Sequence, residues 1–263
     1  TTTTFATTFV PGPIVIGGNT IGQATGLHTQ LNLKGVAINR AAAADIYRAN
    51  IGAVPGSGPI RGVVFYNDVA YAFRDNLAGT AGDIYKSTAA GWVQVVLPGS
   101  SSFTNGIGNV FEGDILTDTA SSTFRLDRLI VDSGTWQSGA PSVGRLYLTQ
   151  LSGPPAGGIA GVWTSSSGGT LTANSWAPTS RLPGGEVNFS IGNFSAQESA
   201  RRIYGADGVN DYFEFDGEVY VPIPVPGTTV KPSLAQVHAN HMFLATEASL
   251  IHSALGSPYN FEV

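Results

Sequence analysis

The chain has 263 residues, a net charge of −5 and no cysteine, which excludes disulfides, zinc–thiolate sites and cysteine nucleophiles. Charged residues make up 12% of the sequence, about half of the ~25% that is usual in soluble domains. With 34 glycines and 42% hydrophobic residues, the composition predicts a folded protein rich in turns and short strands. A weakly charged surface suits either burial against neighbouring subunits or a Thr/Ser-rich exterior.

The distribution of charge and apolar residues also limits the partners. Lys and Arg form no cluster, and the densest pair is Arg201-Arg202. Non-specific binding to nucleic acid needs a basic footprint, so we do not expect it. No apolar run approaches the length that crosses a bilayer, and residues 1–8 lack the pattern of a secretory signal.

The N-terminal region is polar and rich in glycine. Residues 1–35 contain one apolar stretch, residues 13–16, and we expect an extended arm that packs on another surface, although a frayed terminus would have the same composition. Ala41–Ala49 is the one segment of helix-friendly composition, but its Asp45-Ile46-Tyr47-Arg48 recurs as Asp83-Ile84-Tyr85-Lys86 before a strand-like sequence. The recurrence favours a strand at residues 41–49.

The clearest local signal is a β-hairpin at Gly62–Phe73. Two apolar runs flank Asn67-Asp68, and both residue types tolerate the positive φ angles of a two-residue turn. In this register, one face carries Val63, Phe65, Ala70 and Ala72, and the other carries Val64, Tyr66, Val69 and Tyr71. Because both faces are apolar, we expect the hairpin to be covered on both sides.

Similar hairpins recur near the C-terminus. Arg202–Gly205 leads through Asp207-Gly208 to Tyr212–Phe215, and the turn Asp216-Gly217 continues into Glu218–Ile223. His241–Ala245 turns at Thr246–Ala248 into Ser249–Ser253. Repeated short strands with turn signals predict a sandwich, barrel or propeller, and meander hairpins covered on both faces favour propeller blades.

The middle of the chain has a different pattern. Thr123–Val131 and Gly144–Leu148 alternate between apolar and polar residues, whereas Pro154-Pro155 and Ser165–Gly169 are loops. We therefore predict an all-β protein in three parts. These are the extended arm at residues 1–35, propeller-like blades of antiparallel meander sheets at 36–100 and 190–263, and an inserted small β-sandwich or barrel at 101–189.

The histidines and the aspartate-rich loop do not form a convincing metal site. His238 and His241 are three residues apart, a spacing that places side chains of one strand on opposite faces. Together with His252, and without a carboxylate at ligand spacing, they are better explained as structural histidines. Asp207–Asp211 lacks the calcium-loop pattern and favours a simple turn.

The sequence gives no arrangement of side chains that indicates catalysis. The acidic groups Glu112, Asp114, Asp118 and Glu214, Asp216, Glu218 are the candidates for hydrolysis, which needs two carboxylates about 5–10 Å apart in a cleft. Glu214 and Glu218 flank a tight turn, so solvated carboxylates are favoured. A sugar-binding platform could be formed by tryptophans, but such residues more often fill the core of a sheet. The chain has four of them: Trp92, Trp136, Trp163 and Trp176. Gly17–Gly22 lacks the strand–helix context of a dinucleotide site. We expect no catalytic residue, cofactor or metal.

Several stretches resemble the tail proteins of short-tailed bacteriophages. Arg202–Asn210 followed by Phe215-Asp216-Gly217 resembles a blade of such proteins, as does His238–Leu244 followed by Ser253–Phe261. Arg128–Gly139 resembles a β-module that is often inserted in them, and Gly62–Val95 is similar to another blade.

The resemblance implies a structural virion protein of the tail, a tube, nozzle or hub subunit that forms a ring around the DNA exit channel during DNA ejection. Its expected partners are copies of itself, other tail or portal/adaptor proteins, and genomic DNA that slides through a mildly acidic lumen without adhering. No catalytic residue is carried over. Such proteins are usually longer, and these blades are too few to close a propeller. The chain is then truncated, its blades pair with those of another chain, or the sheets are not a propeller.

Two other functions remain open. The first is a carbohydrate- or receptor-binding tail protein that contacts a host surface glycan through Trp136 or Trp163. The second, which the residue pattern disfavours, is a glycan-degrading enzyme that uses Glu214 or Glu112.

Overall fold

The computed structural model describes residues 52–153, 158–194, 200–227 and 229–261, together with the backbone of 15–16 and 19–20. The predicted strand at residues 41–49, the loop at Pro154-Pro155 and most of the predicted arm at residues 1–35 lie outside this range. The chain divides into two units, residues 1–53 and 54–263. In the first unit, β1 (Val15–Ile16) pairs with β2 (Asn19–Thr20), and the rest of the description concerns the second unit.

The described residues form an all-β protein, as predicted. They contain no α-helix, and every strand pairing is antiparallel. None of them lies in a helix long and apolar enough to cross a membrane.

The first sheet is a four-stranded meander of β3 (Ser57–Tyr66), β4 (Val69–Asp75), β5 (Gly82–Thr88) and β6 (Gly91–Gln94). The predicted hairpin and its register are confirmed, because Tyr66 pairs with Val69 and Val64 with Tyr71. Asn67 and Asp68 have φ angles of 48° and 62°, which is the two-residue turn that their side chains favour.

Two more meanders follow later in the chain. The second sheet contains β14 (Asn188–Asn193), β15 (Arg201–Ala206), β16 (Tyr212–Phe215) and β17 (Tyr220–Ile223), and the third contains β18 (Leu234–His238), β19 (His241–Thr246) and β20 (Ser249–His252). The predicted hairpins are confirmed, but β17 begins at Tyr220, not at residue 218. The carboxylate of Asp216 accepts the backbone N–H groups of residues 218 and 219, which keeps both residues in the turn.

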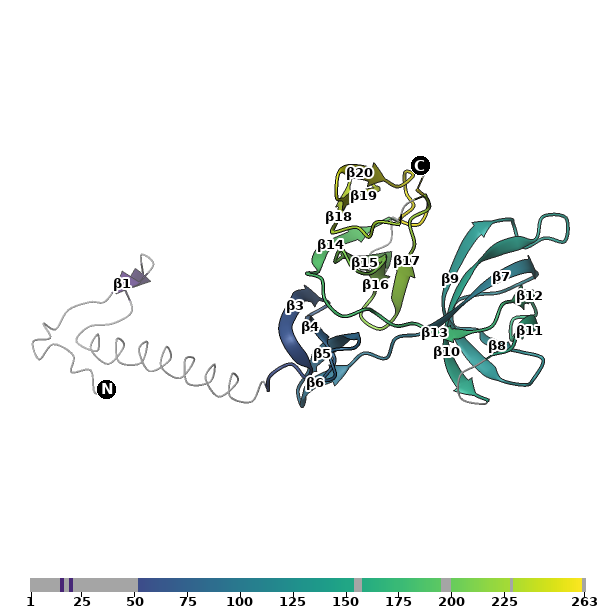
Figure 1. Cartoon of the computed structure of the whole chain (residues 1–263), viewed down its shortest axis with the longest axis horizontal. Coiled ribbons are helices and arrows are strands. Elements are labelled where there is room, and N and C mark those ends of the chain that lie inside the picture. The colour runs from purple at the N-terminus through teal and green to yellow at the C-terminus, as the bar shows by residue number, and fades with distance from the viewer. Residues whose placement is uncertain are drawn as a thin grey trace, which may run out of the picture. The chain divides into compact units, whose positions relative to one another are not determined.

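The three sheets are stacked face to face in chain order (Figure 1). One core lies between the first and second sheets, and it includes Val64, Tyr66, Phe73, Ile84, Ile203, Phe213 and Phe215. Another lies between the second and third sheets, and it includes Tyr204, Tyr212, Val221, Ile223, Ala235, Met242 and Leu244. The second sheet is therefore covered on both faces, and all four residues of β16 are buried.

The chain between the first and second sheets forms a closed barrel. Its six strands are β7 (Gly99–Ile107), β8 (Ile115–Thr117), β9 (Thr123–Ser133), β10 (Ser142–Ser152), β11 (Gly161–Ser165) and β12 (Thr170–Ala173), and β10 pairs with β7 to close it. A short β13 (Ala177–Pro178) adds to β7. Alternate side chains fill the interior, among them Phe103, Leu116, Phe124, Leu126, Leu146, Leu148 and Trp163. Closure leaves these strands without free edges.

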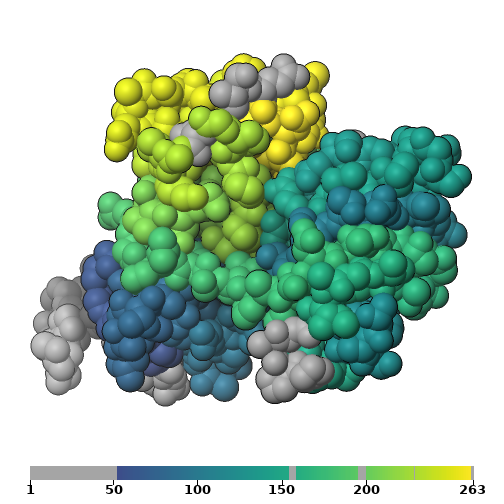
Figure 2. Space-filling model, turned by 45° about the vertical axis from the view of Figure 1, so that its right-hand side comes forward, coloured from purple at the N-terminus to yellow at the C-terminus, as the bar shows by residue number. Residues whose placement is uncertain are grey.

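The barrel packs against the stack of sheets (Figure 2). Ile130 and Tyr147, from β9 and β10, belong to the core between the second and third sheets. The Tyr147 hydroxyl donates a hydrogen bond of 2.7 Å to the carbonyl of Pro222 in β17, the last strand of the second sheet. The contact therefore lies at the edge of that sheet that is farthest from β14.

The expectation that the first hairpin is covered on both sides is wrong within the described residues. On the face turned away from the second sheet, Phe65 is 72% exposed and Val63 49%. Val54 covers part of this face, where it packs with Ala72 and Tyr85. The first sheet is one end of the stack, so no other sheet of the described chain covers this face.

Replacement of Phe73 by alanine tests the core between the first two sheets. The Phe73 ring is fully buried, and its centroid lies 5.1 Å from that of Phe189 and 5.6 Å from that of Phe213. We expect Phe73→Ala to lower the free energy of unfolding by about 3–5 kcal/mol, measured by urea denaturation. Phe65→Ala in the same hairpin is the matched control and should change it by less than about 0.5 kcal/mol in the monomer. Equal losses for the two variants would contradict the described packing.

Candidate functional site

A buried ionic cluster joins the barrel to the second sheet. Arg128 projects from β9, and its guanidinium lies 3.1 Å from Glu214 Oε1 and 2.8 Å from Asp216 Oδ2. On the barrel side it lies 3.2 Å from Glu112 Oε2, and that carboxylate also accepts the backbone N–H of residue 129. One cation is thus shared among three carboxylates.

Burial dominates the electrostatics of the cluster. The side chain of Glu214 is 2% exposed, and burial raises the pKa of its carboxyl above the ordinary value, although Arg128 acts in the opposite direction. Burial lowers the pKa of the Arg128 guanidinium, but the surrounding carboxylates, Glu214 first, raise it by more, so the net shift is upward. The expectation that Glu214 is a solvated turn residue is therefore wrong.

Two tyrosines complete the surroundings of Glu214. The hydroxyls of Tyr204 and Tyr259 both donate to Glu214 Oε2. Burial, and then the nearby charge of Glu214, raise the pKa of both phenols, so these hydroxyls stay protonated as donors. Glu112 and Glu214, the two carboxylates considered for hydrolysis, are thus bonded to the same guanidinium. The arrangement fixes the barrel against the second sheet.

The other acidic residues of the barrel organise its loops. Asp114 accepts hydrogen bonds from Ser165 Oγ at 2.6 Å and Ser167 Oγ at 2.7 Å. Burial raises the pKa of Asp114, but these hydrogen bonds outweigh it and the net shift is downward. Asp118 accepts the backbone N–H groups of residues 120 and 122. Both carboxylates are satisfied by protein donors.

Asp207 belongs to a second buried ion pair. Its carboxylate lies 2.8 Å from Arg181 and also accepts the backbone N–H groups of Val209 and Asn210. Gly208 has a φ of 75°, which confirms the predicted turn. The Arg181 guanidinium lies 4.9 Å from the centroid of the Phe73 ring, in the core between the first two sheets. Sequence reasoning missed Arg181, because the residues next to it in the sequence do not indicate burial.

The histidines of the third sheet share one face, which corrects the prediction. His238 and His241 pair directly across a two-residue turn, and His252 pairs with Phe243 on the next strand. The prediction assumes that both residues lie in one strand, whereas Ala239 and Asn240 form a turn between two strands. Among the described residues, no group of three or more histidine, aspartate or glutamate side chains is placed to hold a metal ion.

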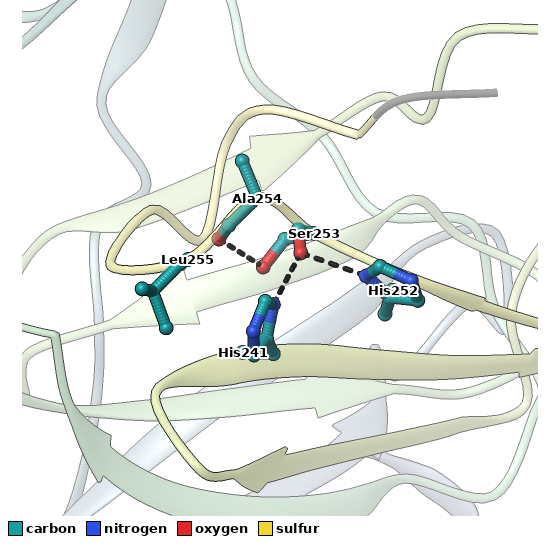
Figure 3. A pocket seen from close by; sticks show the side chains of 5 residues that line it. All are labelled: His241, His252, Ser253, Ala254 and Leu255. Carbon is teal, nitrogen blue, oxygen red and sulfur yellow. Dashed lines mark hydrogen bonds between the residues drawn. The ribbon is translucent and has the colours of Figure 1, made fainter.

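A small pocket lies beside two of these histidines (Figure 3). Its walls are His241, His252, Ser253, Ala254 and Leu255, and its volume is about 210 Å³. The carbonyl oxygen of Ser253 lies 2.7 Å from His241 Nδ1 and 3.0 Å from His252 Nδ1. A carbonyl only accepts hydrogen bonds, so both rings carry a proton on Nδ1 and are held in place by the same oxygen.

The tryptophans divide between core and surface. Trp163 is fully buried and stacks on Phe124, which confirms the core assignment for this residue and removes it from any sugar platform. Trp92 and Trp176 are half-buried. Trp136, in the loop between β9 and β10, is half-buried too, and its ring stacks on Phe103 of β7.

Replacement of Glu214 by glutamine tests the buried carboxylate. Because the pKa of Glu214 is raised in the folded chain, the folded state takes up this proton at a higher pH than the unfolded state does. The contribution of Glu214 to stability is therefore present below the pKa of the unfolded state and is lost as the pH rises through the pKa of the folded state. We expect the wild type to gain stability relative to Glu214→Gln as the pH is lowered, in urea titrations from about pH 7 to about pH 4.

Asp114→Asn is the matched control, and its effect has the opposite sign. The pKa of Asp114 is lowered on folding, so its contribution is present above the unfolded pKa and is lost as the pH falls through the folded pKa. The wild type should therefore lose its advantage over Asp114→Asn when the urea titrations are extended below about pH 4. The same sign of pH dependence for both variants would contradict the described environments.

Comparisons of this chain with protein-family models, with curated proteins and with solved structures gave no match.

Proposed function

We propose that the chain is a structural subunit of a bacteriophage tail, which joins copies of itself into a propeller-bearing ring around the path of the DNA. The observation that carries the proposal is the stack of three meander sheets, which exposes large apolar side chains on the outer face of each end sheet within the described residues. An unpaired apolar face of this kind marks a surface that another chain covers.

The order of the strands supports propeller-like blades. In a propeller the first strands of successive blades lie next to one another around the central channel. Here the first strands are β3, β14 and β18. The backbone N–H of Val187, just before β14, donates to the carbonyl of Arg61 in β3 at 2.8 Å. The N–H of Val237 in β18 donates to Ser190 Oγ in β14 at 3.0 Å.

The two end faces support assembly with other chains. On the first sheet, Ile60 is 45% exposed and Phe65 72%; on the third, Leu234 is 44% exposed and Leu250 66%. A weakly charged chain with such faces is expected to associate. Its net charge of −5 lets DNA pass without being held, because DNA binding depends on basic groups that neutralise phosphates.

One observation favours a second candidate, the binding of a receptor glycan. Trp136 has a φ of 59°, which tryptophan rarely adopts, in a loop whose other residues are mostly exposed. Strained backbone of this kind often occurs at binding sites. A glycan array probed with the wild type and Trp136→Ala tests this candidate; binding that is lost in the variant would support it, and equal signals would dismiss it.

The oligomeric state tests the leading proposal. We expect light scattering behind size-exclusion chromatography to give a mass above 27.2 kDa that rises with concentration and reaches a closed ring. Electron microscopy of the same fractions should show rings. A chain that stays monomeric at all concentrations and does not associate with purified phage tails would contradict the proposal.

A further inference from the structure

The stack of sheets has a direction. The first sheet meets the second through the face of Val64 and Tyr66, and the second meets the third through its opposite face, that of Tyr204 and Val221. The two free faces are consequently different surfaces. The phenylalanine face, on β3, carries Ile60, Val63 and Phe65. The histidine face, on the third sheet, carries Leu234, Gln236, His238, His241, Phe243, Leu250 and His252.

Phe65 is the projecting side chain of the phenylalanine face. It lies two residues before the turn at Asn67, and its side chain is 72% exposed although it pairs with Ala70 inside a regular strand. An exposed aromatic ring on a rigid strand loses little conformational freedom when it is buried in a partner. Aromatic anchors of this kind contribute most of the affinity in many interfaces.

The pocket on the histidine face has the size and the chemistry to accept such a ring. Its volume is about 210 Å³, and a cavity of roughly 150 Å³ is sufficient to bind benzene. Ala254 and Leu255 give it apolar walls, and Leu255 is 70% exposed at its side. Hydrogen bonds to Ser253 fix the imidazoles of His241 and His252, and the planes of the two rings make an angle of 86°. The pocket is therefore formed before any partner binds.

Continuity of the stack brings the ring and the pocket together. A second copy that lies with its phenylalanine face on the histidine face continues the stack in the same direction. Phe65 lies beside the first turn of its sheet, and His241 directly follows the first turn of the third sheet, at Ala239-Asn240. The two features therefore lie at corresponding ends of their sheets.

We infer that Phe65 of one copy inserts into the pocket formed by His241, His252 and Leu255 of the next copy. This contact is the interface of the proposed ring, and the inference rests on that proposed function. The interface is heterologous, because each copy contributes its phenylalanine face on one side and its histidine face on the other. A heterologous contact closes into a ring or extends into a filament.

Two variants of the full chain test the contact, one on each side. Phe65→Glu removes the ring, and Leu255→Glu places a charge beside the pocket. Each variant alone should raise the apparent dissociation constant of self-association by at least about tenfold in sedimentation velocity, as expected for loss of an aromatic anchor. Both residues are largely exposed, so both variants should unfold at the temperature of the wild type at concentrations where the wild type is monomeric.

The mixture of the two variants is the decisive measurement. Phe65→Glu keeps an intact pocket and Leu255→Glu keeps an intact Phe65, so an equimolar mixture should form one-to-one dimers that cannot grow. Phe111→Glu and Leu77→Glu, at residues 58% and 84% exposed elsewhere, are the matched controls and should associate like the wild type.

The other outcomes separate the inference from the proposed function. If the wild type associates and the two variants associate equally well, the contact assigned here is wrong and the proposed function stands. Failure of the mixture to form dimers, when each variant alone is monomeric, also overturns the contact. A wild type that is monomeric throughout contradicts the proposed function, and the inference falls with it.

Discussion

The fold depends on the burial of the second sheet between the first and the third. Its strands β16 and β17 have four residues each, and a sheet of such short strands gains little from its own hydrogen bonds. Phe213 and Phe215 point into one core and Tyr212 and Val221 into the other, so each neighbouring sheet removes a complete apolar face from water. In the part of the chain that the structure describes, the first and third sheets have such cover on one face only, and each exposes large apolar side chains on the other.

Buried charges give this stack its specific arrangement. Arg181 with Asp207, and Arg128 with Glu214, are ion pairs held inside the second unit, and removing charges from water costs more than simple apolar packing would. Arg128 nevertheless restrains the barrel, because it pairs with both Glu214 and Asp216 of the second sheet. We regard these pairs as devices for orientation more than for stability.

Local signals made the hairpins predictable, and long-range contacts did not. Asn67-Asp68 announces its turn, so the register of β3 and β4 follows from the sequence. Ala239 and Asn240 also have positive φ angles, of 47° and 62°, but alanine at the first turn position gives no such signal, so the sequence predicts one strand with His238 and His241 on opposite faces. The burial of Glu214 was also not predictable from local signals. The residues next to it in sequence indicate an exposed turn, and its partner Arg128 comes from a distant strand. The pocket beside His241 depends on the orientation of one carbonyl, which no residue pattern specifies.

The position of the barrel is compatible with a stack that grows through its ends. The barrel contacts the second sheet at β17, its last strand, through Tyr147 and Pro222, and it does not occupy the strand β14 that lies between β3 and β18. A domain inserted at the outer edge adds bulk without covering either end face. In the proposed assembly, copies meet head to tail through these two different faces, and the angle between successive sheets would determine whether it closes. The ion pairs of Arg128 restrain the barrel at this edge, and the two end faces that the proposed assembly uses stay exposed within the described residues.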